Sequence, residues 1–98
     1  MLLVRQEFQA KYGRGDELVA LFKEFHARAE LPNRERARLM TDASGPFFTI
    51  VTEYEVENFA TWESTFQRMM SDPQTDAWFK RMMEVTESGR RDFYNIVV

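Results

Sequence analysis

Polar and apolar positions alternate in some segments of the chain and recur every three to four residues in others. Residues 2–12 alternate, with one side mostly apolar and the other polar, which predicts a strand with one buried face. Apolar residues in the next segment recur at helical spacing. We expect a helix over residues 16–30, which begins with Asp16 as its N-cap and ends before Pro32.

Two further strands are predicted in the middle of the chain. Residues 34–41 alternate again and are rich in arginine. Residues 42–46 follow as a turn, because Asp, Ser, Gly and Pro gather there. Residues 47–56 are rich in aromatic and β-branched side chains and form the strongest strand pattern in the chain. Because this segment begins with apolar residues on both faces, we expect it in the centre of a sheet.

Two helices and a last strand complete the pattern. Asn58 is placed to cap a helix that carries a stripe of aromatic residues and methionines. Asp72–Pro73 begins another helix, with Asp as the cap and Pro as the first helical residue. We expect Ser88–Gly89 to end this helix and residues 90–98 to form the final strand.

The predicted order of elements is β-α-β-β-α-α-β, which is the ferredoxin-like arrangement. We therefore expect an α+β fold in which the helices cover one face of a four-stranded antiparallel sheet, with the strands ordered 4-1-3-2 in space. The turn over residues 42–46 is too short for a parallel crossover between the second and third strands. No linker or repeat divides the chain, so we expect one domain over residues 1–98.

The sheet face without helices is expected to be a homodimer interface. Strict alternation places apolar, β-branched and charged side chains together on it, and a monomer would leave the apolar ones in water. Two such faces packed together would cover them and let the charges pair. The expected interface residues are Arg5, Glu7, Phe47, Val51, Glu53, Phe93, Asn95 and Val97. The alternative is a monomer with a half-polar sheet face.

Composition and charge exclude several classes of function. The chain has 13 Lys and Arg residues against 16 Asp and Glu residues, a net charge of −3, which argues against binding to nucleic-acid phosphates. It has no cysteine, so thiolate catalysis, disulfides and cysteine-ligated metals are excluded. Its apolar runs are too short for a membrane span or a signal peptide. We expect a cytoplasmic protein without a metal, a cofactor or a membrane partner.

Four short motifs lie at the junctions between the predicted elements. They are YEVENFATWE at residues 54–63, SDP at residues 71–73 ahead of Trp78, ESGRR at residues 87–91 and YGRGDEL at residues 12–18. Together they resemble the corresponding junctions of the dimeric α+β barrel superfamily, in its NIPSNAP-like and antibiotic-biosynthesis-monooxygenase-like branch. The resemblance covers nearly the whole chain, and it implies that two copies form a barrel with their sheets face to face.

The resemblance also implies a ligand pocket between the sheet and the helices of each subunit, which leaves room for a small hydrophobic or aromatic ligand. The expected lining residues are Gln6, His26, Tyr54, Trp62, Trp78 and Tyr94. Haem-degrading members of the superfamily carry an Asn on the first strand and a His in the second half of the chain. This chain has Gln6 on its first strand, and its single histidine is His26 on the first helix, so that pattern is absent.

The choice between catalysis and simple binding depends largely on His26. Histidine exchanges protons readily near neutral pH, so His26 is the candidate catalytic residue. The alternative, which we favour, is a structural histidine at the edge of the core with a backbone partner. Two functions follow. The first is a small-molecule-binding or interaction protein without catalysis. The second is a cofactor-independent monooxygenase or isomerase that acts on a small aromatic or quinone-like substrate.

Overall fold

The computed structural model describes residues 1–98, and it confirms the predicted order of the main elements. These elements are β1 (Leu2–Ala10), α1 (Gly15–Arg28), a 3₁₀ turn (Arg34–Arg36), β2 (Arg38–Thr41), β3 (Thr49–Val56), α2 (Phe59–Met70), α3 (Pro73–Val85) and β4 (Thr86–Asn95). None of the helices has the length and apolar character that a membrane span requires.

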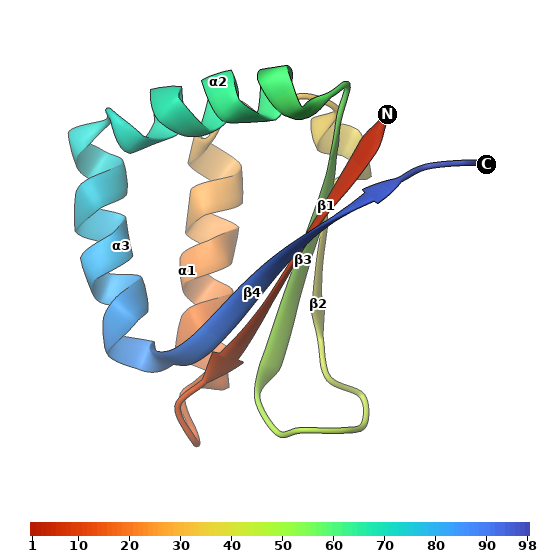
Figure 1. Cartoon of the computed structure of the whole chain (residues 1–98). Helices are drawn as coiled ribbons and strands as arrows, with labels where there is room; N and C mark the ends of the chain where they lie inside the picture. Colours follow the sequence, from red (N-terminus) through yellow and green to blue (C-terminus); the bar gives the residue numbers. More distant parts are fainter.

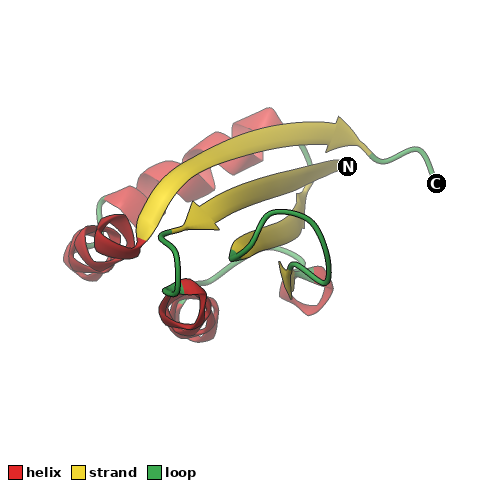
Figure 2. Cartoon of the chain, turned by 90° about the horizontal axis from the view of Figure 1, so that it is seen from below, coloured by secondary structure: helices red, strands yellow, loops and turns green.

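The four strands form one antiparallel sheet in the order β2-β3-β1-β4, as predicted. The central strands β1 and β3 pair along most of their lengths, from Leu2 opposite Val56 to Gln9 opposite Thr49. In Figure 1, α1 and α3 stand side by side next to the strands, and α2 runs across their upper ends. Figure 2 shows the strands as a curved layer, beyond which the C-terminal residues extend.

The core lies between the helices and the sheet and has two parts. The larger part joins α1 and α3 to the sheet around Leu18, Ile50 and Trp78. The smaller part lies at the other end of the sheet around Val4 and Val56, which are fully buried. The buried strand residues in both parts of the core occupy even-numbered positions of β1 and β3, whose side chains point to the same face of the sheet. Alternation therefore correctly predicted which side of β1 and β3 is covered by the helices.

Two of the three predicted helix caps are confirmed. The side chains of Asn58 and Asp72 accept hydrogen bonds from the backbone N–H groups of Thr61 and Gln74. The predicted cap at Asp16 is wrong, because α1 begins one residue earlier, at Gly15. Asp16 therefore lies inside the first turn, where a negative charge still interacts favourably with the helix dipole.

The two strands of the hairpin formed by β2 and β3 are shorter than predicted. The expected strand over 34–41 contains a 3₁₀ turn, and only Arg38–Thr41 pairs with β3. The expected strand over 47–56 begins at Thr49, because Phe48 has a φ angle of 61°, which a strand cannot accommodate. Phe48 instead packs against the core beside α1.

The largest correction concerns the last strand. Ser88–Gly89 does not end a helix: α3 ends at Val85, and β4 begins directly after it. Gly89 lies within β4, opposite Phe8, and a Cβ there would lie 2.9 Å from Cδ1 of Phe8. The glycine therefore serves a close approach between two strands rather than a turn.

The register of β4 also reverses the faces that we predicted for its residues. Phe93 lies opposite Val4 and Asn95 opposite Leu2, so both lie on the helix-covered side of the sheet. Phe93 contacts the rings of Phe59 and Trp62, which shelter it from water. The prediction that Phe93 and Asn95 lie on the open face is therefore wrong. Tyr94, expected in the pocket, lies on the open face and is 51% exposed.

Candidate functional site

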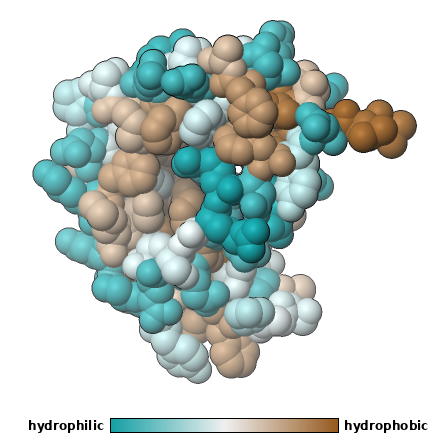
Figure 3. All heavy atoms as spheres, viewed as in Figure 1, coloured by the Kyte–Doolittle hydropathy of each residue, from teal (hydrophilic) through white to brown (hydrophobic).

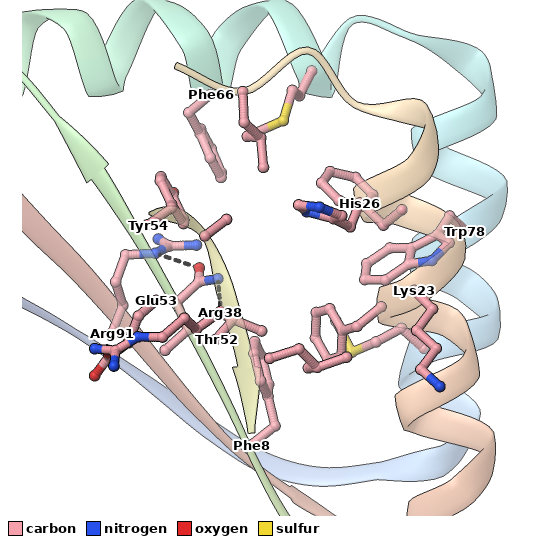
Figure 4. Close-up of a pocket in the computed structure, with 18 of the residues that line it drawn as sticks. Phe8, Lys23, His26, Arg38, Thr52, Glu53, Tyr54, Phe66, Trp78 and Arg91 are labelled. Atoms are coloured by element: carbon pink, nitrogen blue, oxygen red, sulfur yellow. Dashed lines mark hydrogen bonds and ion pairs between the residues drawn. The ribbon is translucent and has the colours of Figure 1, made fainter. Parts of the chain in front are cut away.

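A cavity of about 360 Å³ lies between the sheet and the helices (Figure 4). Residues from all four strands, from α1, α2 and α3 and from the segment between α1 and β2 line it, and 13 of the 20 lining residues are hydrophobic. In Figure 3, apolar side chains reach the surface between the helices and the strands, with hydrophilic side chains beside them. A concave, mainly apolar space of this size is typical of a small-molecule site.

The helix side of the cavity is aromatic. Phe22 and Phe25 of α1 both contact Trp78 of α3, with ring centroids 5.3 and 4.9 Å apart. The indole N–H of Trp78 donates a 2.7 Å hydrogen bond to the backbone oxygen of Leu21. Because its polar atom is satisfied inside the core, Trp78 presents only apolar ring surface to the cavity.

The sheet side carries a row of polar groups on three neighbouring strands. Gln6 lies opposite both Thr52 and Arg91, so all three side chains point to the same side of the sheet. Nε of Arg91 donates to Oε1 of Gln6 at 2.9 Å, and Nε2 of Gln6 donates to Oγ1 of Thr52 at 3.0 Å (Figure 4). These bonds hold the amide of Gln6 in one orientation.

Tyr54 lies beside this row and is buried. Its hydroxyl oxygen accepts a 2.9 Å hydrogen bond from the indole N–H of Trp62. Burial raises the pKa of Tyr54, and the bond from Trp62 and the charge of Arg91 oppose that rise. The hydroxyl therefore stays protonated at neutral pH and keeps a hydrogen that it can donate to a ligand.

Arg91 is held at the end of the polar row by two aromatic rings. Its guanidinium carbon lies 5.0 Å from the ring centre of Trp62 and 5.2 Å from that of Phe66. The rings of Trp62 and Phe66 stack on each other. The guanidinium is therefore positioned by cation–π contacts on one side and by Gln6 on the other.

His26 points into the cavity from α1, opposite Tyr54 and Arg91 (Figure 4). It is exposed and forms no hydrogen bond or ion pair with another residue. The expected backbone partner of a structural histidine is therefore wrong. The imidazole is free to contact a molecule in the cavity.

Four of the six predicted pocket residues line the cavity: Gln6, His26, Tyr54 and Trp78. Trp62 does not line the cavity but donates a hydrogen bond to the hydroxyl of Tyr54, which does. Tyr94 lies on the opposite, open face of the sheet. Sequence reasoning missed Arg91 and Thr52. Alternation puts Arg91 on the same side of the last strand as Phe93, but it does not say which side that is, and the pairing of β4 with β1 places both on the helix-covered face.

The open sheet face carries a network of ion pairs. Glu53 is bound by Arg5 at 3.5 Å and by Arg38 at 2.5 Å, and Arg5 also lies 3.7 Å from Glu7. Of the expected interface residues, Arg5, Glu7, Val51 and Glu53 share this face. Of the other four, Phe93 and Asn95 lie on the helix-covered side. Phe47 and Val97 are exposed but lie beyond the ends of strands, since Phe47 precedes β3 and Val97 follows β4.

Solved structures with the same fold are similar to this chain over nearly its whole length. An uncharacterised NIPSNAP domain protein from Burkholderia xenovorans matches with a TM-score of 0.80 and 18% identity, covering 99% of this chain and 95% of that one. A NIPSNAP family protein from Agrobacterium tumefaciens matches with a TM-score of 0.84 and 13% identity, covering 96% and 90%.

An antibiotic biosynthesis monooxygenase matches with a TM-score of 0.71 and 15% identity, covering 100% of both chains. No protein-family model matches the sequence, and no curated protein matches it. The resemblance that we drew from the junction motifs is thus confirmed for the architecture: the chain has the ferredoxin-like α+β fold of the NIPSNAP and antibiotic-biosynthesis-monooxygenase structures.

Proposed function

We propose that the protein binds a small, mainly apolar organic molecule in the cavity between the sheet and the helices. One observation carries this proposal: the cavity combines an aromatic wall, built around Trp78, with polar groups that converge from the opposite wall, at Gln6, Thr52 and Tyr54. Apolar surface supplies affinity, and a few oriented polar groups select the ligand. A chain that only filled its core would not leave such a space.

The test uses N-phenyl-1-naphthylamine, an uncharged dye whose fluorescence rises in apolar surroundings. We expect saturable binding to the wild-type protein. Ala37 lines the cavity, so Ala37→Trp should fill part of it and weaken binding by tenfold or more, as an order-of-magnitude expectation. Ala77→Trp is the matched control, because Ala77 is exposed on α3 and does not line the cavity. Equal binding by the two variants would contradict the proposal.

Catalysis is the second candidate function. His26 is supported in this role by its position across the cavity from Tyr54, which would let the two residues move protons to and from a bound molecule. The reaction would be an isomerisation, or an oxygenation in which molecular oxygen is the oxidant and a small aromatic or quinone-like substrate itself supplies the electrons. One oxygen atom would enter the product and the other would leave as water. Oxygen uptake or substrate conversion by the wild type, lost in His26→Ala, would favour this function over binding alone.

We also propose that two copies associate through the open sheet faces. Val51 and Tyr94 provide apolar surface there, among charges of both signs. The ion pairs around Glu53 supply partners that could be shared across a two-fold axis. A self-complementary face of this kind fits a homodimer better than it fits a different protein.

A further inference from the structure

We infer that the ligand of the cavity is an amphipathic anion, with an apolar body and a carboxylate that binds to Arg91. This inference rests on the proposed small-molecule binding and adds the chemical class of the ligand. It follows from the charge of the cavity, the free donors of Arg91 and the place of Arg91 in the sheet.

The charged groups of the cavity are not balanced. Glu53 is the only acidic residue among those that line it, and its carboxylate lies on the open face of the sheet, where Arg5 and Arg38 bind it. Lys23 and Arg91 form no ion pair with any carboxylate, and the ammonium of Lys23 ends away from the sheet wall (Figure 4). Arg38 also lines the cavity from the sheet, but it is paired with Glu53. The unpaired charge on the sheet side of the cavity is therefore that of Arg91, although the chain as a whole carries −3.

Arg91 keeps most of its hydrogen-bond donors unused. Only its Nε donates within the protein, to Gln6. The neighbouring Arg90 provides a contrast, since its Nε and one terminal nitrogen both bind Asp92, at 2.9 and 3.1 Å. A guanidinium has five N–H donors in a planar fork that matches a carboxylate. The terminal nitrogens of Arg91 are thus available to bind one.

The position of Arg91 suits a charged headgroup with an apolar body behind it. Arg91 is exposed, and β4 is an edge strand. A carboxylate bound there would keep part of its hydration, whereas one buried deep in the cavity would lose it at high cost. The apolar body would then extend toward Phe66 and Trp78, where apolar surface lines the cavity. The volume of about 360 Å³ limits this body to about three rings or a short alkyl chain.

The experiment compares two ligands that differ in the headgroup alone, 2-naphthoate and 2-naphthylmethanol, by titration calorimetry at neutral pH. We expect the wild-type protein to bind the carboxylate about 10-fold more tightly than the alcohol, because a hydrogen bond between two charged groups contributes about that much more to affinity than a neutral one. Arg91→Met keeps much of the apolar stem and removes the charge. It should abolish the preference, so that the carboxylate binds no more tightly than the alcohol.

Arg90→Met is the matched control, because Arg90 is the next residue in the chain but lies on the open face, opposite Glu7. It should retain the preference for the carboxylate. A second measurement needs no variant: raising the salt concentration should weaken binding of the carboxylate and leave binding of the alcohol unchanged.

The outcomes separate this inference from the function on which it rests. If the wild type binds N-phenyl-1-naphthylamine but shows no preference for the carboxylate, the inference that the ligand is an anion is refuted. The cavity would then still be a ligand site. A preference that survives in Arg91→Met, or that is insensitive to salt, would also refute that inference. Failure of all three compounds to bind the wild type would overturn both proposals together.

Discussion

The indole N–H of Trp62 donates a 2.9 Å hydrogen bond to the hydroxyl of Tyr54, and this bond ties α2 to β3 at the edge of the cavity. Tyr54→Phe would leave the indole N–H without its acceptor. We expect the free energy of unfolding to fall by about 1–2 kcal/mol, measured by urea denaturation. Tyr94→Phe is the control, because Tyr94 is half exposed and donates to no residue. Equal losses in the two variants would show that the Trp62 bond contributes nothing specific.

Tyr54 also predicts how stability changes at high pH. Burial raises its pKa in the folded protein, so the unfolded chain loses this proton first as the pH rises past about 10. The contribution to stability is complete below the unfolded pKa and is lost as the pH rises through the folded pKa. Urea denaturation at increasing alkaline pH should therefore show a steeper fall for the wild type than for Tyr54→Phe. Parallel curves would contradict the prediction.

Gly89 allows β4 to approach the ring of Phe8. A Cβ at this position would lie 2.9 Å from Cδ1 and 3.2 Å from Cε1 of that ring. We expect Gly89→Ala to lower the free energy of unfolding by about 1–3 kcal/mol, because the ring must shift in a packed core. Ser88→Ala, next in the strand and exposed, should change it by less than about 0.5 kcal/mol. A Gly89→Ala protein as stable as the wild type would show that Phe8 moves freely.

His26 is exposed and without a partner, so its removal should hardly affect folding. We expect His26→Ala to change the free energy of unfolding by less than about 0.5 kcal/mol. Thermal and urea denaturation would measure this. A loss of more than about 1 kcal/mol would instead support the structural role that the sequence had suggested.

Val51 tests the proposed homodimer. It lies on the open face opposite Glu7, in the central strand β3. Val51→Lys should shift the protein toward the monomer in sedimentation velocity, because each copy would then bring an unpaired charge into the apolar part of the proposed interface. Ala77→Lys, on the exposed surface of α3, should sediment like the wild type. A wild-type protein that is monomeric at micromolar concentration would refute the dimer.

Local signals in the sequence were enough to determine the kind and order of the elements. Alternation distinguished the strands from the helices, and the side chains of Asn58 and Asp72 marked where α2 and α3 begin. The short turn between β2 and β3 required antiparallel pairing, which led to the correct strand order. These features depend on residues close together in the chain, so periodicity and capping chemistry suffice to predict them.

Only the tertiary structure decided on which face of the sheet each residue of β4 lies and which residues line the cavity. Ser88–Gly89 has the composition of a helix end, yet Gly89 is used where the ring of Phe8 needs space. Arg91 meets Gln6 from 85 positions away, through the pairing of β1 with β4. A shift of one residue in that pairing would turn every side chain of β4 to the opposite face. The register is set by long-range packing of bulky side chains such as Phe93, which no local pattern encodes.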